Sequence, residues 1–81
     1  MNDQHILLVE DDESLQQLIE KLLKNNNYIV SKANNIDEAQ KLVKLFIFDL
    51  IILDVMFPDS TGLEFYRHSI KDRINTPVIF L

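Results

Sequence analysis

The chain has 81 residues, 47% of them hydrophobic and 26% charged, which is the composition of one small folded soluble domain and not that of a disordered segment. Cysteine is absent, which excludes disulfides, thiolate catalysis and cysteine-based metal sites. Thirteen acidic against eight basic residues give a net charge of -5, which argues against a nucleic-acid contact on this segment.

The first part of the chain predicts a strand, a helix and a second strand. Residues 5–9 form a short apolar run that stops at three acids, as expected for a buried strand. Leucine and isoleucine then recur at helical spacing, and polar residues lie on the opposite side of the helix. The apolar positions are Leu15, Leu18, Ile19, Leu22 and Leu23, and the polar ones are Gln16, Gln17, Glu20, Lys21 and Lys24. Three asparagines end this helix, and residues 28–30 predict the second strand.

The remaining part repeats the alternation. Strands are predicted at residues 50–53 and 78–81, and helices after Asn35 and Thr61, each followed three residues later by a glutamate, as in a helix cap. The phenylalanines at 46, 48 and 65 are expected in the core, and the third helix is expected to continue to Ile70. The resulting βαβαβαβ order predicts a parallel sheet covered by helices on both faces.

Acidic residues follow two of the predicted strands. Glu10 and Asp11 end the first strand, and Asp54 ends the third. Ligand sites in such sheets lie beyond the carboxyl ends of the strands, so these acids meet if the two strands are neighbours. Two like charges ~5 Å apart repel by about 3 kcal/mol at an effective dielectric of 20, and a Mg²⁺ ion would offset this repulsion. The pattern therefore suggests magnesium-assisted phosphoryl chemistry, with Asp54 as the nucleophile that forms an acyl phosphate.

Two stretches, "ILLVEDDESL" and "DLIILDVMFPDSTGLEF", resemble the receiver domain of two-component response regulators. The acidic pair after the first strand, Asp54, Pro58 four residues later and Gly62 eight residues later match the pattern of that family. The resemblance runs from about residue 5 to residue 81. It implies a flavodoxin-like (CheY-like) doubly wound parallel sheet with strand order 2-1-3-4. It also implies a domain that assists its own phosphorylation without being a turnover enzyme.

The resemblance also implies roles for individual residues. Asp54 would accept a phosphoryl group from a sensor histidine kinase or a phosphotransfer protein. Asp11 would bind Mg²⁺ directly, Glu10 would assist, and Met56 would contribute its backbone carbonyl. Residues near the docked kinase would help to select the partner; these are Ser14, Gln17, Phe57 and Pro58.

The family's pattern continues beyond a strand such as residues 78–81. It has a Thr or Ser directly after that strand and a Lys after a fifth strand, and the 81 residues include neither position. We therefore expect residues 1–81 to be the amino-terminal portion of a receiver, without the last strand and two helices. A fragment of a longer regulator is favoured over a natural truncation or a chain completed by a second copy. Without the Lys contact, we expect weak acceptor chemistry and no signalling switch.

Other readings of the same residues remain open. The fourth strand, left as an apolar edge, favours self-association, so a non-signalling receiver remnant that acts as a pairing module is one alternative. A magnesium-dependent phosphotransfer enzyme is another, but such sites commonly carry a second acid two residues after the first, where this chain has Met56. Asp12 is expected to cap the first helix. His5 and His68 are expected to be structural or exposed, Asp59 to lie in a turn, and Ser60 and Thr61 to act in capping.

The sequence carries no signal for export or membrane insertion. Its start lacks a basic segment followed by an apolar one. Its longest apolar segment is interrupted at Asp49 and Asp54 and is well short of the ~20 residues of a membrane span. We expect a cytoplasmic protein with no membrane contact.

Overall fold

A computed structural model describes residues 4–54, 62–67 and 76–81. The predicted alternation of strands and helices is confirmed. The strands are β1 (His5–Val9), β2 (Ile29–Ala33), β3 (Leu50–Leu53) and β4 (Val78–Phe80), and the helices are α1 (Glu13–Asn25), α2 (Ile36–Leu45) and α3 (Gly62–Phe65). Within the described part of the chain, no helix has the length and apolar character needed to cross a membrane.

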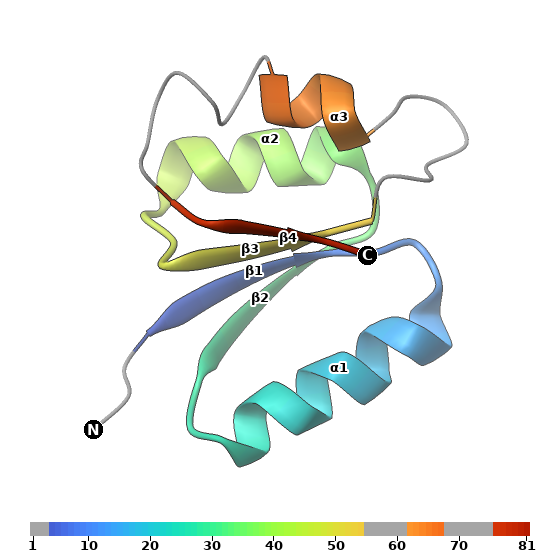
Figure 1. The fold of residues 1–81 in the computed structure, drawn as a ribbon, viewed down its shortest axis with the longest axis vertical. Helices are drawn as coiled ribbons and strands as arrows, with labels where there is room; N and C mark the ends of the chain where they lie inside the picture. Colours follow the sequence, from blue (N-terminus) through green and yellow to red (C-terminus); the bar gives the residue numbers. More distant parts are fainter. Residues whose placement is uncertain (1–3, 55–61, 68–75) are drawn as a thin grey trace.

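The four strands form one parallel sheet in the order β2-β1-β3-β4 (Figure 1), which confirms the expected order. β1 lies between β2 and β3, and its last residue, Val9, pairs with Ala33 on one side and Leu53 on the other. β1 and β3 are nearly continuous aliphatic runs, as expected for parallel strands that are buried on both faces. All strands end at the same edge of the sheet.

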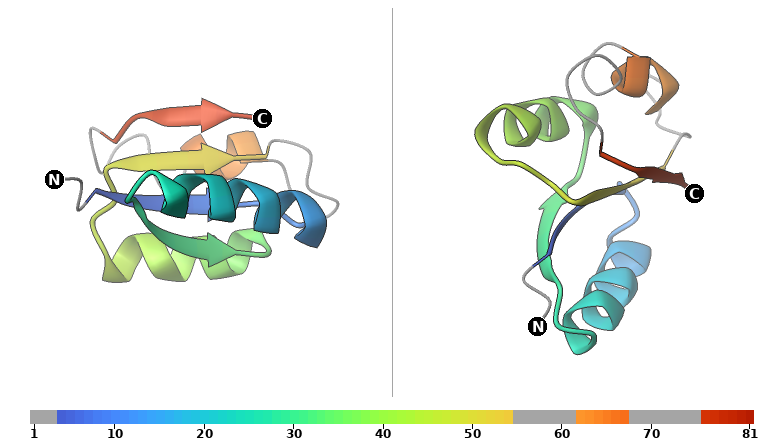
Figure 2. Two further views of the ribbon diagram at one scale, coloured as in Figure 1. Left: turned by 90° about the horizontal axis from the view of Figure 1, so that it is seen from below. Right: turned by 60° about the vertical axis from the view of Figure 1, so that its left-hand side comes forward.

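Helices cover the two faces of the sheet, with α1 on one face and α2 and α3 on the other (Figure 2). Side chains alternate along a strand, so Leu7 and Val9 pack on the side of α2 and α3, while Ile6 and Leu8 pack on the side of α1. Each such buried side chain stabilises the fold by about 1.5–3 kcal/mol. β1 is therefore held from both faces as well as from both edges.

Local polar contacts fix the helix ends as the sequence predicts. The Oδ1 atom of Asp12 accepts hydrogen bonds from the backbone N–H groups of Ser14 (3.0 Å) and Leu15 (3.2 Å) at the start of α1. At the start of α2, Asn35 Oδ1 accepts from the backbone N–H of Glu38 at 2.8 Å. After α1, Asn27 has a φ of 69°, the left-handed conformation that asparagine tolerates better than most residues. These contacts confirm the predicted ends of the first helix and the start of the second.

The expected place of Phe46 in the core is wrong, because its side chain is 49% exposed. α2 ends at Leu45, and Phe46 has extended backbone as the residue that caps the helix, which carries its ring away from the core. The ring lies instead edge-on to that of His5, with the ring centroids 5.8 Å apart. Phe48 and Phe65 are buried as expected.

The apolar stripe of α1 is only partly covered by the sheet. Ile19 and Leu23 pack against the core, whereas Leu18 and Leu22 are 61% and 59% exposed.

The second strand is longer than predicted and extends to Ala33. The prediction followed the apolar run, which ends where polar residues begin within this strand. The predicted cap at Thr61 and the predicted end of the third helix at Ile70 lie outside the described residues.

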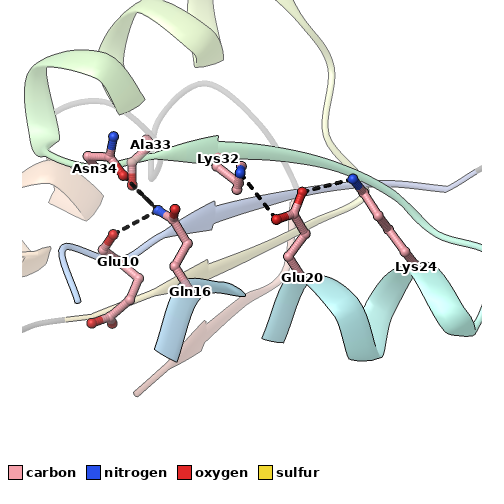
Figure 3. A network of polar contacts seen from close by, with 7 residues as sticks. All are labelled: Glu10, Gln16, Glu20, Lys24, Lys32, Ala33 and Asn34. Atoms are coloured by element: carbon pink, nitrogen blue, oxygen red, sulfur yellow. Dashed lines mark hydrogen bonds and ion pairs between the residues drawn. The ribbon is translucent and has the colours of Figure 1, made fainter. Parts of the chain in front are cut away.

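An ion-pair network joins α1 to β2. Glu20 on α1 lies 2.8 Å from Lys24 Nζ on the same helix and 3.1 Å from Lys32 Nζ on β2 (Figure 3). Hydrogen bonds from Lys24 and Lys32 lower the pKa of Glu20. Since both lysines are well exposed, we expect each pair to stabilise the fold by less than about 1 kcal/mol.

Candidate functional site

The carboxyl ends of β1 and β3 place two acids side by side. Val9 and Leu53 are paired in the sheet, and Glu10 and Asp54 are the residues that follow them. The backbone N–H of Asp54 donates to the Val9 carbonyl at 3.0 Å, which extends the pairing by one residue beyond β3. The position of Asp54 is thus determined by the buried sheet behind it.

The three acids that the sequence singles out lie together. Glu10, Asp11 and Asp54 each offer one carboxylate oxygen, and these oxygens lie within 4.8 Å of one another. Glu10 is buried, Asp54 is half-buried and Asp11 is exposed. The cluster therefore has a rigid side in the protein and an open side toward solvent.

Glu10 is an uncommon residue for a buried position. It is only 2% exposed, and its Oε1 atom accepts a hydrogen bond from the backbone N–H of Asp12 at 3.2 Å. The Oε2 atom is buried and has no hydrogen-bond partner among the described residues. Burial raises the pKa of Glu10, and the neighbouring carboxylates of Asp54 and Asp11 raise it further against the opposing effect of the Asp12 N–H.

This arrangement fits a hard divalent cation. A buried oxygen without a partner costs about 1–3 kcal/mol, and the clustered negative charges add repulsion. Mg²⁺ takes oxygen ligands and is commonly bound through one or two carboxylates with water and phosphate oxygens completing its shell. The exposed Asp11, the half-buried Asp54 and the buried Glu10 together supply such oxygens.

Gln16 is a polar neighbour of the cluster that the sequence did not single out. Its pattern placed Gln16 on the solvent side of α1, but the residue is buried and its Nε2 atom donates to the backbone carbonyl of Glu10 at 2.9 Å (Figure 3). Helical side chains tilt toward the amino terminus of their helix. A polar residue in the first turn of a helix that follows a buried strand could therefore have been expected to reach back to the end of that strand.

The remaining predicted site residues fall into two groups. Ser14 and Gln17 are exposed near the start of α1, at the edge of the sheet that carries the acids. Met56, Phe57 and Pro58 lie outside the described residues, as do Asp59, Ser60, Thr61 and His68.

His5 lies at the opposite end of β1 from the acids. Its Nε2 atom is 2.7 Å from Ser31 Oγ, and its ring centroid is 4.6 Å from that of Phe48. This agrees with the expected structural role.

Comparison with known sequences identifies similar proteins. The profile of the family described as "Response regulator receiver domain" matches residues 6–81. The chain is 35% identical over 77 residues to Protein PetR of Rhodobacter capsulatus, which covers 95% of the chain and 32% of that protein. It is 37% identical over 76 residues to the cell cycle transcriptional regulator CtrA of Caulobacter vibrioides, covering 94% of the chain and 33% of CtrA. The chain thus spans about a third of the length of these curated relatives.

Solved structures resemble the fold closely. The receiver domain of HemR from Leptospira biflexa, solved in its non-phosphorylated form, has a TM-score of 0.88 and 36% identity, with 96% of this chain and 63% of that one covered. The response regulator TrrA from Thermotoga maritima, solved in complex with Mg²⁺–BeF, has a TM-score of 0.87 and 30% identity over 95% of this chain and 67% of that one.

Proposed function

Because the chain belongs to the response regulator receiver domain family, we propose that it carries the phosphoacceptor site of a two-component response regulator. A sensor histidine kinase or a phosphotransfer protein would be the donor. The bond between phosphorus and the donor's histidine nitrogen would break as a bond forms from phosphorus to a carboxylate oxygen of Asp54. The proposal concerns this segment alone, since the chain spans about a third of its curated relatives.

The observation that carries the proposal is the clustering of Asp54 with Glu10 and Asp11 at one edge of the sheet. Asp54 is fixed through its backbone bond to Val9 and is half-buried, which suits a nucleophile that has to be aligned with an incoming group. Asp11 and Glu10 would hold Mg²⁺, with the backbone carbonyl of Met56 as a further ligand implied by the family. Mg²⁺, when bound, would neutralise the charge of the phosphoryl group.

The exposed residues near the start of α1 support a docking role beside this site. Ser14 and Gln17 would contact the kinase together with Phe57 and Pro58, and would contribute to the choice of partner. Such contacts fit a protein that positions its acceptor for another protein and does not turn over a substrate of its own.

The test of the proposal is phosphorylation by a small donor. The chain is incubated with acetyl phosphate, with and without Mg²⁺, and its intact mass is followed. A phosphoryl adduct that requires Mg²⁺ is expected for the unmodified chain, and no adduct is expected for Asp54→Asn. Asp49→Asn, at the opposite end of β3, is the matched control and should still form the adduct. An unmodified sample that is folded by circular dichroism and forms no adduct would contradict the proposal.

A second role, self-association, is favoured by the exposure of β4. Ile79, Phe80 and Leu81 are 51%, 43% and 48% exposed, and β4 is an edge strand in the described part of the sheet. Pro77 and Leu81 bond to β3, so the backbone groups of Val78 and Phe80 point to the open side. Two copies of the chain could pair along this edge.

A further inference from the structure

A buried amide group holds the backbone from which two of the clustered acids project. We propose that Gln16 is a positioning residue for the cation site: by fixing the carbonyl of Glu10, it sets the directions of the Glu10 and Asp11 side chains. This inference rests on the proposed function, because it assumes that the acids bind Mg²⁺.

The contacts of Gln16 determine the orientation of its amide group. The residue is 5% exposed, and its Nε2 atom donates to the Glu10 carbonyl at 2.9 Å and to Asn34 Oδ1 at 2.9 Å, with a longer contact of 3.4 Å to the Ala33 carbonyl (Figure 3). Backbone carbonyl oxygens only accept hydrogen bonds. The NH₂ group of Gln16 must therefore face the ends of β1 and β2, and the reverse orientation would place two oxygens against each other.

The bond to the Glu10 carbonyl acts on both acids of the pair. The N–H of Glu10 donates to the Ala33 carbonyl at 3.1 Å, beyond the paired residues of β1 and β2. The Glu10 carbonyl belongs to the peptide plane that links Glu10 to Asp11, and such a plane moves as one unit. Holding its oxygen thus limits the rotation of the backbone on either side, from which the two carboxylates project.

The other contact anchors Gln16 itself. Asn34 accepts from Gln16, and its own backbone N–H donates to Glu38 Oε1 at 2.7 Å. Gln16 is also in the first turn of α1, where its N–H donates to the Asp12 carbonyl at 2.9 Å. The amide group is therefore held between the starts of α1 and α2, and it has little freedom to follow a displaced Glu10.

The experiment separates positioning from ordinary stabilisation. Gln16→Met keeps nearly the same side-chain length and removes the donors. Leu23→Ala is the matched control, since it weakens packing in the last part of the same helix and on the far side from the acids. Mg²⁺ affinity is measured by titration, following the backbone amide NMR signals of Asp11 and Asp54. We expect Gln16→Met to bind Mg²⁺ about tenfold more weakly or worse, as is usual for groups that orient metal ligands, and Leu23→Ala to bind it with the affinity of the unmodified chain.

Each other outcome has a definite meaning. Equal affinities of the unmodified chain and Gln16→Met would overturn the inference. Equal losses in Gln16→Met and Leu23→Ala would overturn it as well, because the effect would then follow stability alone. If the unmodified chain does not bind Mg²⁺, the proposed function fails and the inference fails with it. This outcome differs from failure of the inference alone, in which the unmodified chain binds Mg²⁺ and Gln16→Met binds it equally well.

A measurement on the unmodified chain covers the case in which Gln16→Met does not fold. The side-chain amide protons of Gln16 should exchange slowly with solvent and shift on addition of Mg²⁺. Those of the exposed Gln17 serve as the comparison within the same molecule and should exchange fast. Equally fast exchange at both side chains would overturn the inference.

Discussion

The burial of Glu10 has a cost to folding. Its carboxylate is removed from water, lies beside two other acids and has one oxygen without a partner among the described residues. An uncharged side chain of the same shape would avoid these costs. We therefore interpret Glu10 as a residue whose charge serves ligand binding at the expense of stability.

The raised pKa of Glu10 predicts how stability depends on pH. Below its ordinary value of 4.5 the carboxyl group is protonated in the folded and unfolded states, so it has no effect. As the pH rises, the unfolded chain releases this proton first, and the folded state loses stability until the pH passes the raised pKa. Glu10→Gln should therefore be more stable than the unmodified chain at neutral pH, with a difference that disappears in acid.

Thermal unfolding without Mg²⁺, between about pH 4 and about pH 8, checks this expectation. A variant that is less stable than the unmodified chain at neutral pH would contradict it. Added Mg²⁺ should stabilise the unmodified chain more than the variant. An ion bound to the folded state stabilises it, and the variant lacks the Glu10 carboxylate that is proposed to help bind Mg²⁺.

Helix α1 depends on the cap that joins it to the acidic run. Asp12 satisfies two backbone N–H groups in the first turn, while its own N–H bonds to Glu10. Asp12→Ala should lower the free energy of unfolding by about 1 kcal/mol, because the cap bonds are lost. Urea unfolding measures the change. Asp12→Asn is the control, since asparagine caps helices equally well; a loss as large as that of Asp12→Ala would show that charge, not capping, is what matters.

The elements differ in how far the sequence predicts them. The positions of β1 and β3 are predicted from aliphatic runs that end in acids, because a strand that is buried on both faces needs apolar side chains at nearly every position. The meeting of Glu10 and Asp54 follows from the same runs once their strands are neighbours. The burial of Gln16 and the exposure of Phe46 do not follow from periodicity, since each depends on where a helix end lies relative to the sheet.

For the molecule as a whole, the open side of β4 is the surface proposed for self-association. If two copies pair there, Ile79→Lys should weaken self-association about tenfold or more, because it removes an apolar contact and places a charge on the edge strand. Sedimentation velocity over a range of concentrations measures the effect. Ile47→Lys is the matched control, as Ile47 is 86% exposed in the connection between α2 and β3. Equal effects of the two substitutions would argue against pairing through β4.

The central position of β1 has a consequence for the order in which the protein forms during synthesis. β1 is synthesised well before β3, the strand that completes its second edge, since His5 and Asp49 meet across 44 residues of chain. Pairings so distant in sequence close late in folding. Glu10 and Asp11 are therefore brought beside Asp54 only after β3 has paired with β1. A kinase that recognises the proposed acceptor site would thus leave unfinished chains unmodified.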